Sequence, residues 1–212
     1  MKNFLWLICI IVIGCEKQDV QQEKVSKVSS EVNKTFLENG DTLWVDKFTS
    51  NVQWIGRKIT GDEHSGRIQA AGGFIVKNND ILQNGEILMN MQSITVDDIE
   101  NPKWNQKLVD HLKNDDFFNT EIYPTAKFVF DKFEGKGADT HVSGELTIRD
   151  KTVPTDFILN VVVDRDSSFA TGTVNIDRTL FDIKYGSGSF FEGLGDRIIL
   201  DEFTLNFKLI AY

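Results

Sequence analysis

A strict alternation of apolar and polar residues recurs from about residue 41 onward and restricts what this chain can fold into. Between His141 and Arg149, the apolar Val142, Leu146 and Ile148 are separated by polar residues and one glycine. Successive side chains of a β-strand point to opposite faces, so this period indicates strands with one buried face. The same period recurs in four other segments, which contain Ile87, Met89 and Met91, Phe128 and Phe130, Phe157 to Val163, and Phe203 to Phe207.

Clusters of turn-forming residues separate the alternating segments. They lie at Asn78-Asn79-Asp80, Asn84-Gly85, Gly135-Lys136-Gly137 and Asp164 to Ser168. Gly, Asn and Asp favour turns because they tolerate left-handed backbone or hydrogen-bond locally. About eight short strands joined in this way predict an all-β domain, either a barrel or a sandwich. Gly144, inside one alternating segment, predicts that another group approaches that strand closely.

One segment has a helical period instead. Asn101 and Pro102 suit the N-cap and the first position of a helix. The residues expected on one face of that helix are Trp104, Leu108, His111 and Leu112. We therefore expect one short amphipathic helix whose apolar face packs against the barrel, at one of its ends.

The N-terminal segment predicts an export signal. A short apolar run, Phe4 to Ile13, follows the basic Lys2 and is too short to span a hydrocarbon layer of about 30 Å. It ends in Val12-Ile13-Gly14-Cys15, which resembles the lipobox of bacterial lipoproteins, where the cysteine is acylated. We expect a signal peptide over residues 1–14, a lipidated polar tether over 15–40 and one barrel domain over 41–212. The expected location is the cell envelope or periplasm, with the protein held to a membrane by acylated Cys15.

Composition and spacing exclude several kinds of chemistry. The net charge of -9 argues against nucleic acid as a partner, because such binding depends on clustered basic residues. Both cysteines, Cys9 and Cys15, precede the predicted barrel, so the barrel has no disulfide, thiolate metal site or cysteine nucleophile. The histidines, His64, His111 and His141, match no metal-ligand spacing, and no serine lies in a nucleophile elbow. We expect no metal, no organic cofactor and structural roles for the histidines.

An ordered series of segments runs through the domain from Asp41 to Tyr212. It comprises Val52-Gln53-Trp54-Ile55-Gly56, Gly61 to Gly66, Asn90 to Ile94, Leu108 to Phe118, Tyr123 to Phe128, Gly144 to Arg149, Ile176 to Thr179 and Tyr185 to Ser189. In order and spacing these segments resemble the YceI-like family of polyisoprenoid-binding proteins. Arg149-Asp150 is a departure, since many relatives carry Lys-Gly there. The resemblance implies a lipocalin-like antiparallel β-barrel of about eight strands around an elongated apolar cavity.

The resemblance also implies which residues meet a lipid. The expected lining of the cavity comprises Phe74, Met89, Met91, Trp104, Leu108, Phe128, Phe130, Leu146 and Phe157. The alternation alone leaves open a barrel filled by its own side chains. Arg178 is in register with Val174 and Ile176, so it should face inward, where a guanidinium needs a carboxylate or a ligand anion. We expect an ion pair for Arg178, with a lipid head-group contact as the alternative.

The leading hypothesis is a protein, not an enzyme, that binds and sequesters or carries a long apolar lipid in the cell envelope. The lipid would be a polyisoprenoid, a quinone-like molecule or a fatty-acid-like amphiphile. Two other classes stay open, an envelope enzyme that uses histidine and carboxylate groups, and a solid-core barrel that acts as a protein-interaction module. A homodimer is a further possibility.

Overall fold

The computed structural model describes residues 40–79, 81–135 and 137–212. The expected signal peptide, most of the expected tether and Cys15 lie outside these residues. The described strands are β1 (Asp41–Trp44), β2 (Asn51–Arg57), β3 (Glu63–Asn78), β4 (Ile81–Asn90), β5 (Thr125–Glu134), β6 (Gly137–Ile148), β7 (Lys151–Val163), β8 (Ser168–Asp177) and β9 (Glu202–Ala211). The described helices are α2 (Pro102–Lys113) and three 3-10 turns, η2 (Met91–Ser93), η3 (Arg178–Phe181) and η4 (Gly195–Arg197).

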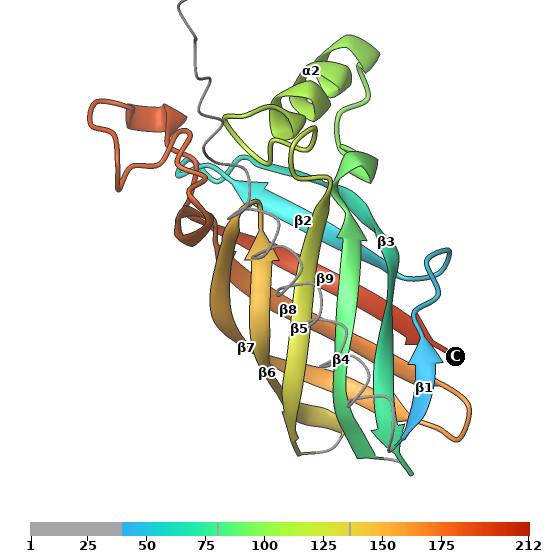
Figure 1. Ribbon diagram of the computed structural model, residues 1–212. Helices are drawn as coiled ribbons and strands as arrows, with labels where there is room; N and C mark the ends of the chain where they lie inside the picture. Colours follow the sequence, from blue (N-terminus) through green and yellow to red (C-terminus); the bar gives the residue numbers. More distant parts are fainter. Residues whose placement is uncertain (1–39, 80, 136) are drawn as a thin grey trace, which may run out of the picture. The chain divides into compact units, whose positions relative to one another are not determined.

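Eight of these strands close into an antiparallel barrel, which confirms the predicted fold class (Figure 1). The order around the barrel is β3-β2-β9-β8-β7-β6-β5-β4, and β4 pairs with β3 to complete the ring. The short β1 pairs with the C-terminal half of β3, and β2 pairs with its N-terminal half. Val45, directly after β1, bridges to Ala211 at the end of β9, so β1 and β2 together occupy the place of one strand. Closure of the ring pairs strand edges that would otherwise be exposed.

The alternation read from the sequence corresponds to the inner and outer faces of the barrel wall. In β7, Leu159 and Val161 are buried in the interior, whereas Ile158 before them and Val162 after them are exposed. Phe128 and Phe130 of β5 also share the inner face, and their rings are 5.8 Å apart. The predicted pattern of buried positions is therefore confirmed for these strands.

The predicted turn at Asn84-Gly85 is wrong, because both residues lie inside β4. A Cβ on Gly85 would lie 2.4 Å from Cζ of Phe130 and 2.5 Å from the carbonyl oxygen of Phe74. Glycine stands here because the Phe130 ring occupies the space of a side chain. The expected close approach at Gly144 is confirmed, since a Cβ there would lie 2.2 Å from the carbonyl oxygen of Val129.

Helix α2 begins as predicted, and of its expected apolar face Leu108 and Leu112 pack against the core whereas Trp104 does not. The Asn101 side chain accepts hydrogen bonds from the amides of Lys103 and Trp104, and Pro102 takes the first helical position. The buried residues are Val109 and Leu112, and the Trp104 side chain is 55% exposed beside the ammonium of Lys107. The expectation that Trp104 packs against the barrel is wrong, because the packed face is centred on Leu108, Val109 and Leu112. None of the helices within the described residues is both long and apolar enough to cross a bilayer.

The apolar interior has two parts. One lies beneath α2, which covers this end of the barrel in Figure 1, and includes Trp54, Ile94, Leu112 and Ile183. The other lies toward the loop between β7 and β8, at the opposite end, and includes Phe130. The two parts share half-buried residues at the middle of the barrel, Met89, Phe128, Phe157 and Val174.

Candidate functional site

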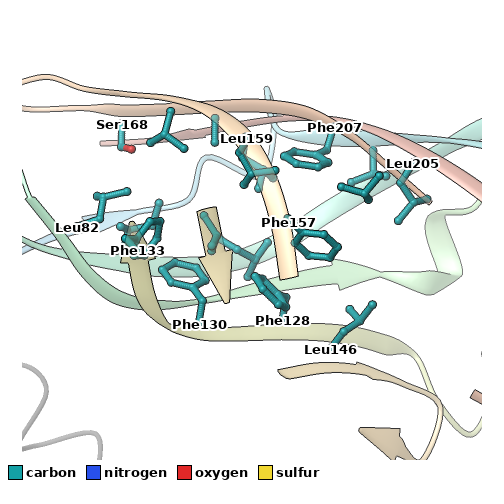
Figure 2. A pocket seen from close by; sticks show the side chains of 18 of the residues that line it. Leu82, Phe128, Phe130, Phe133, Leu146, Phe157, Leu159, Ser168, Leu205 and Phe207 are labelled. Carbon is teal, nitrogen blue, oxygen red and sulfur yellow. The ribbon is translucent and has the colours of Figure 1, made fainter. Parts of the chain in front are cut away.

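A cavity of about 130 Å³ lies inside the barrel, and each of the strands β2 to β9 contributes to its wall (Figure 2). Its lining residues share an apolar character with one exception, Ser168. They are Val52, Ile75, Leu82, Ile87, Met89, Phe128, Phe130, Phe133, Val142, Leu146, Phe157, Leu159, Val161, Ser168, Ala170, Val174, Leu205, Phe207 and Leu209. A charged group buried here would be unpaired, because no ionisable side chain is among these described residues. The site therefore suits an uncharged apolar molecule.

Phenylalanine rings form a continuous row along the cavity (Figure 2). The ring of Phe130 lies 5.0 Å from that of Phe133 and 5.8 Å from that of Phe128. Phe128 lies 4.9 Å from Phe157, which in turn is 6.5 Å from Phe207. These separations are typical of tilted and edge-to-face aromatic pairs. These phenylalanine rings line the cavity and also occupy much of the barrel interior. The orientation of each ring therefore determines how much space is left for a ligand.

The size of the cavity restricts what fits without rearrangement. An apolar cavity of about 150 Å³ in another protein stays dry and binds benzene. The present cavity of about 130 Å³ is thus large enough for one group of ring size. A longer chain fits only if some of the phenylalanine rings rotate away from the axis of the barrel.

Five of the sequence-predicted pocket residues line this cavity, namely Met89, Phe128, Phe130, Leu146 and Phe157. That they contact a lipid stays a prediction. The other four lie elsewhere. Phe74 packs edge-on against Trp44 at 6.2 Å, Met91 and Leu108 belong to the apolar cluster beneath α2, and Trp104 is exposed.

Sequence reasoning missed Ser168 as a cavity residue and took it for part of a turn. Ser168 is the first residue of β8 and is 2% exposed. The signal was present, because Ser168, Ala170 and Val174 lie on one face of the strand at even spacing, and all three line the cavity. Extending the alternation of β8 backward would have placed Ser168 inside the barrel.

Arg178 is buried at the α2 end, and its guanidinium is held by protein acceptors. Nε donates to the carbonyl of Leu200 at 3.1 Å, Nη1 to Ile183 at 2.8 Å, and Nη2 to Ile199 at 3.0 Å. The expected ion pair is present, since Nη2 lies 3.6 Å from Oδ1 of Asp201. Burial lowers the pKa of Arg178, and the charge of Asp201 opposes this effect. These contacts fasten the segment before β9 to η3, whereas a head-group contact of Arg178 stays a prediction.

Asp201 completes this polar cluster. Its Oδ2 accepts a hydrogen bond of 2.5 Å from the hydroxyl of Ser189. Burial acts to raise the pKa of Asp201, but the hydroxyls of Ser187 and Ser189 and the charge of Arg178 outweigh it and lower the pKa below 3.8. The carboxylate is therefore stabilised in the folded protein.

The histidines have separate local contacts. His64 Nδ1 lies 2.7 Å from Oδ2 of Asp98, where burial opposes but the Ser65 amide and His64 together lower the pKa of Asp98. The His111 ring packs edge-on against Tyr185 at 4.5 Å. His141 is exposed on β6. Within the described ranges, no group of three or more His, Cys, Asp or Glu residues is arranged to hold a metal ion.

Comparison with known proteins places this geometry in a family. A family model described as the YceI-like domain matches residues 44–211. BcnA from Burkholderia cenocepacia is 20% identical with a TM-score of 0.57, and the match covers 79% of this chain and 99% of that one. A polyisoprenoid binding domain from Saccharophagus degradans is 14% identical with a TM-score of 0.60, over 82% of this chain and 98% of that one. At these identities the likeness concerns the fold. No curated protein matches this chain in sequence. Because the family model covers most of its length, the chain belongs to the YceI-like domain family.

Proposed function

We propose that this barrel binds an uncharged apolar lipid of the isoprenoid class and holds or carries it without reacting with it. The observation that carries the proposal is the cavity, whose wall is apolar at every lining position except Ser168. The solved structure from Saccharophagus degradans, which is similar in fold, is described as a polyisoprenoid binding domain. Isoprenoid chains are branched hydrocarbons, and apolar burial contributes about 25 cal/mol for each Å² removed from water.

The row of phenylalanines is the means by which a long chain is accommodated. A ligand longer than one ring-sized group displaces rings such as Phe128 and Phe157, and its own methyl groups replace the ring-to-ring contacts that are lost. Rotation of a ring between staggered positions keeps the backbone of the barrel in place. We therefore expect affinity to rise with chain length until the row of rings is fully displaced.

The chemistry of the cavity supports binding over catalysis. Acyl transfer and hydrolysis need a nucleophile with a base beside it. The one hydroxyl in the described lining belongs to Ser168, and neither a histidine nor a carboxylate lines the same cavity. The His64 and Asp98 pair lies on the part-exposed start of β3 and the segment after η2, and neither residue lines the cavity.

We propose in addition that the protein is exported and held in the cell envelope by acylated Cys15. The support is the sequence Val12-Ile13-Gly14-Cys15 after a short apolar run. Two or more acyl chains give stable attachment, at about 0.8 kcal/mol for each buried methylene. A tethered barrel would take up and release lipid close to a membrane.

A cavity-filling variant tests the binding proposal. Ala170 lines the cavity, and Ala170→Leu places a larger side chain in the ligand's space. The matched control is Ala126→Leu, at a buried alanine of β5 beneath α2 that does not line the cavity. Overpacking costs about 1–3 kcal/mol in either case, so the fold of both is checked by circular dichroism.

We expect Ala170→Leu to lose affinity for an isoprenoid hydrocarbon, measured by displacement of a fluorescent apolar probe, and Ala126→Leu to keep it. Equal affinities in the wild type and both folded variants would place the ligand outside the barrel.

A further inference from the structure

Ser168 has a hydroxyl that the protein itself does not use. The residue is 2% exposed, and its Oγ makes no hydrogen bond within the described part of the chain. Figure 2 shows Ser168 at one end of the cavity, near Leu82 and Phe133. This is the end formed by the loop between β7 and β8, which lies opposite α2.

A hydroxyl that faces an apolar cavity and makes no hydrogen bond there is unfavourable, because it has lost its hydrogen bonds to water. Packing does not require it, since Ala170 occupies the same face of β8 two residues later with a methyl group alone. The arrangement therefore offers one hydrogen-bond donor and acceptor to a molecule inside an otherwise apolar space.

Lys77, a buried positive charge at this end of the barrel, is already engaged. Lys77 of β3 is buried, and its ammonium donates to the carbonyl of Asp164 at 3.0 Å and to the carbonyl of Arg165. Both acceptors lie in the loop directly before Ser168. Lys77 ties β3 to that loop and is not part of the cavity wall. A carboxylate or phosphate next to Ser168 would have to compete with these carbonyls, whereas a hydroxyl or carbonyl oxygen would not.

We propose that Ser168 forms a hydrogen bond with an uncharged oxygen of the lipid, an alcohol or a carbonyl, and fixes that oxygen at the β7–β8 end of the barrel. The proposal rests on lipid binding in the cavity and names the class of lipid. The hydrocarbon chain then runs from Ser168 along the row of phenylalanines toward α2. The Ser168 hydroxyl, the one polar side-chain group in the described cavity wall, would favour isoprenoids that carry an alcohol or a carbonyl over pure hydrocarbons. Lipids with a charged terminal group are disfavoured in this position.

Three ligands with the same isoprenoid chain test the proposal: farnesene, farnesol and farnesoic acid at neutral pH. Each is measured against purified full-length protein stripped of co-purifying lipid, by displacement of a fluorescent apolar probe. We expect the wild type to bind farnesol about tenfold more tightly than farnesene, which corresponds to about 1.4 kcal/mol and is the scale of one net hydrogen bond. Farnesoate should bind more weakly than farnesol.

Ser168→Ala should remove the preference for farnesol over farnesene by lowering the affinity for farnesol. Without lipid, its thermal unfolding temperature should be equal to or above that of the wild type, because the change removes an unpaired hydroxyl and no hydrogen bond of the described protein. The matched control is Ser143→Ala on β6, where the side chain is on the outer face between buried Val142 and inward-facing Gly144, and the preference for farnesol should persist.

The outcomes separate this proposal from the function on which it rests. If all three ligands bind but the farnesol preference is absent, or survives in Ser168→Ala, the assignment of Ser168 is overturned and lipid binding stands. If farnesoate binds most tightly and Lys77→Met abolishes that advantage, the polar partner is Lys77 and the proposal fails. If none of the three ligands binds the wild type, both the proposal and the proposed function fail.

Discussion

Truncation of the Phe130 side chain distinguishes a hollow barrel from a filled one, because the two predict different losses of stability and of lipid affinity. The side chain is 4% exposed, lies in contact distance of the Phe128 and Phe133 rings, and lines the cavity. In a well-packed core, Phe→Ala costs about 3–5 kcal/mol, with about 24 cal/mol for each Å³ of cavity that remains. One side of the Phe130 ring faces empty space and lacks partner atoms there, so we expect Phe130→Ala to cost about 3 kcal/mol, the lower end of this range.

The matched control is Phe181→Ala. Phe181 lies in η3, is 1% exposed, and packs in the cluster beneath α2 without lining the cavity. We expect this truncation to cost about 5 kcal/mol, the upper end of the range, and to leave lipid affinity unchanged. Phe130→Ala should lower lipid affinity as well as stability, because part of the ring's contacts in the loaded protein belong to the lipid.

Urea unfolding of the full-length protein without lipid gives the midpoint and the dependence on denaturant for each variant. Lipid at about a hundred times its Kd should then add about 2.7 kcal/mol to the wild type. Phe130→Leu and Phe181→Leu, which remove fewer atoms and therefore cost less than the alanine variants, serve if an alanine variant does not fold. The reasoning is refuted if Phe130→Ala costs as much as Phe181→Ala and neither variant changes lipid affinity.

Three further predictions address the anchor, the packing of β3 and the polar cluster. Cys15→Ala should leave the protein unacylated and move it from the membrane fraction to the soluble fraction, and unchanged fractionation would contradict the lipobox interpretation. Gly66→Ala should cost about 3 kcal/mol by thermal or urea unfolding, the upper end of the usual cost of overpacking, because its Cβ would lie 1.8 Å from the carbonyl oxygen of Thr95, and a shift under 1 °C would contradict this packing. Asp201→Asn should destabilise at neutral pH, because the lowered pKa of Asp201 beside Arg178 gives stability that is present above pH 3.8 and lost as pH falls below it. Its deficit relative to the wild type should shrink toward about pH 2, and a deficit independent of pH would argue that Asp201 acts by packing alone.

The fold was predictable because alternation is a local property of each strand. Segments such as Phe157 to Val163 carry their inner and outer faces in the sequence itself, and turn residues at Asn78 to Asp80 separate β3 from β4. The Asn84-Gly85 pair misled because its local signal is that of a hairpin turn. Gly85 instead pairs with Ile75 of β3 and Phe130 of β5, and the Phe130 ring fills the space of a side chain there, which sequence spacing cannot show.

The site was predictable only in part for a related reason. Met89, Phe128 and Phe157 could be predicted as cavity residues, because the alternation along their strands puts their side chains on the inner face. The prediction for Trp104 was wrong because a sequence pattern does not fix how a helix is rotated about its own axis. In α2 that rotation is set by the packing of Val109 and Leu112. Whether inward residues fill the barrel or leave space depends on side-chain volumes across the whole ring, so the cavity itself had to come from the structure.

Native mass spectrometry of the protein purified from bacteria that produce it, followed by organic extraction, tests lipid binding most directly. The cavity predicts a complex of one protein chain with one uncharged isoprenoid lipid, whose mass is lost on extraction and restored when that lipid is added back. A protein that is free of lipid when purified, and that takes up no isoprenoid when one is supplied, would contradict the account and leave a filled barrel in its place.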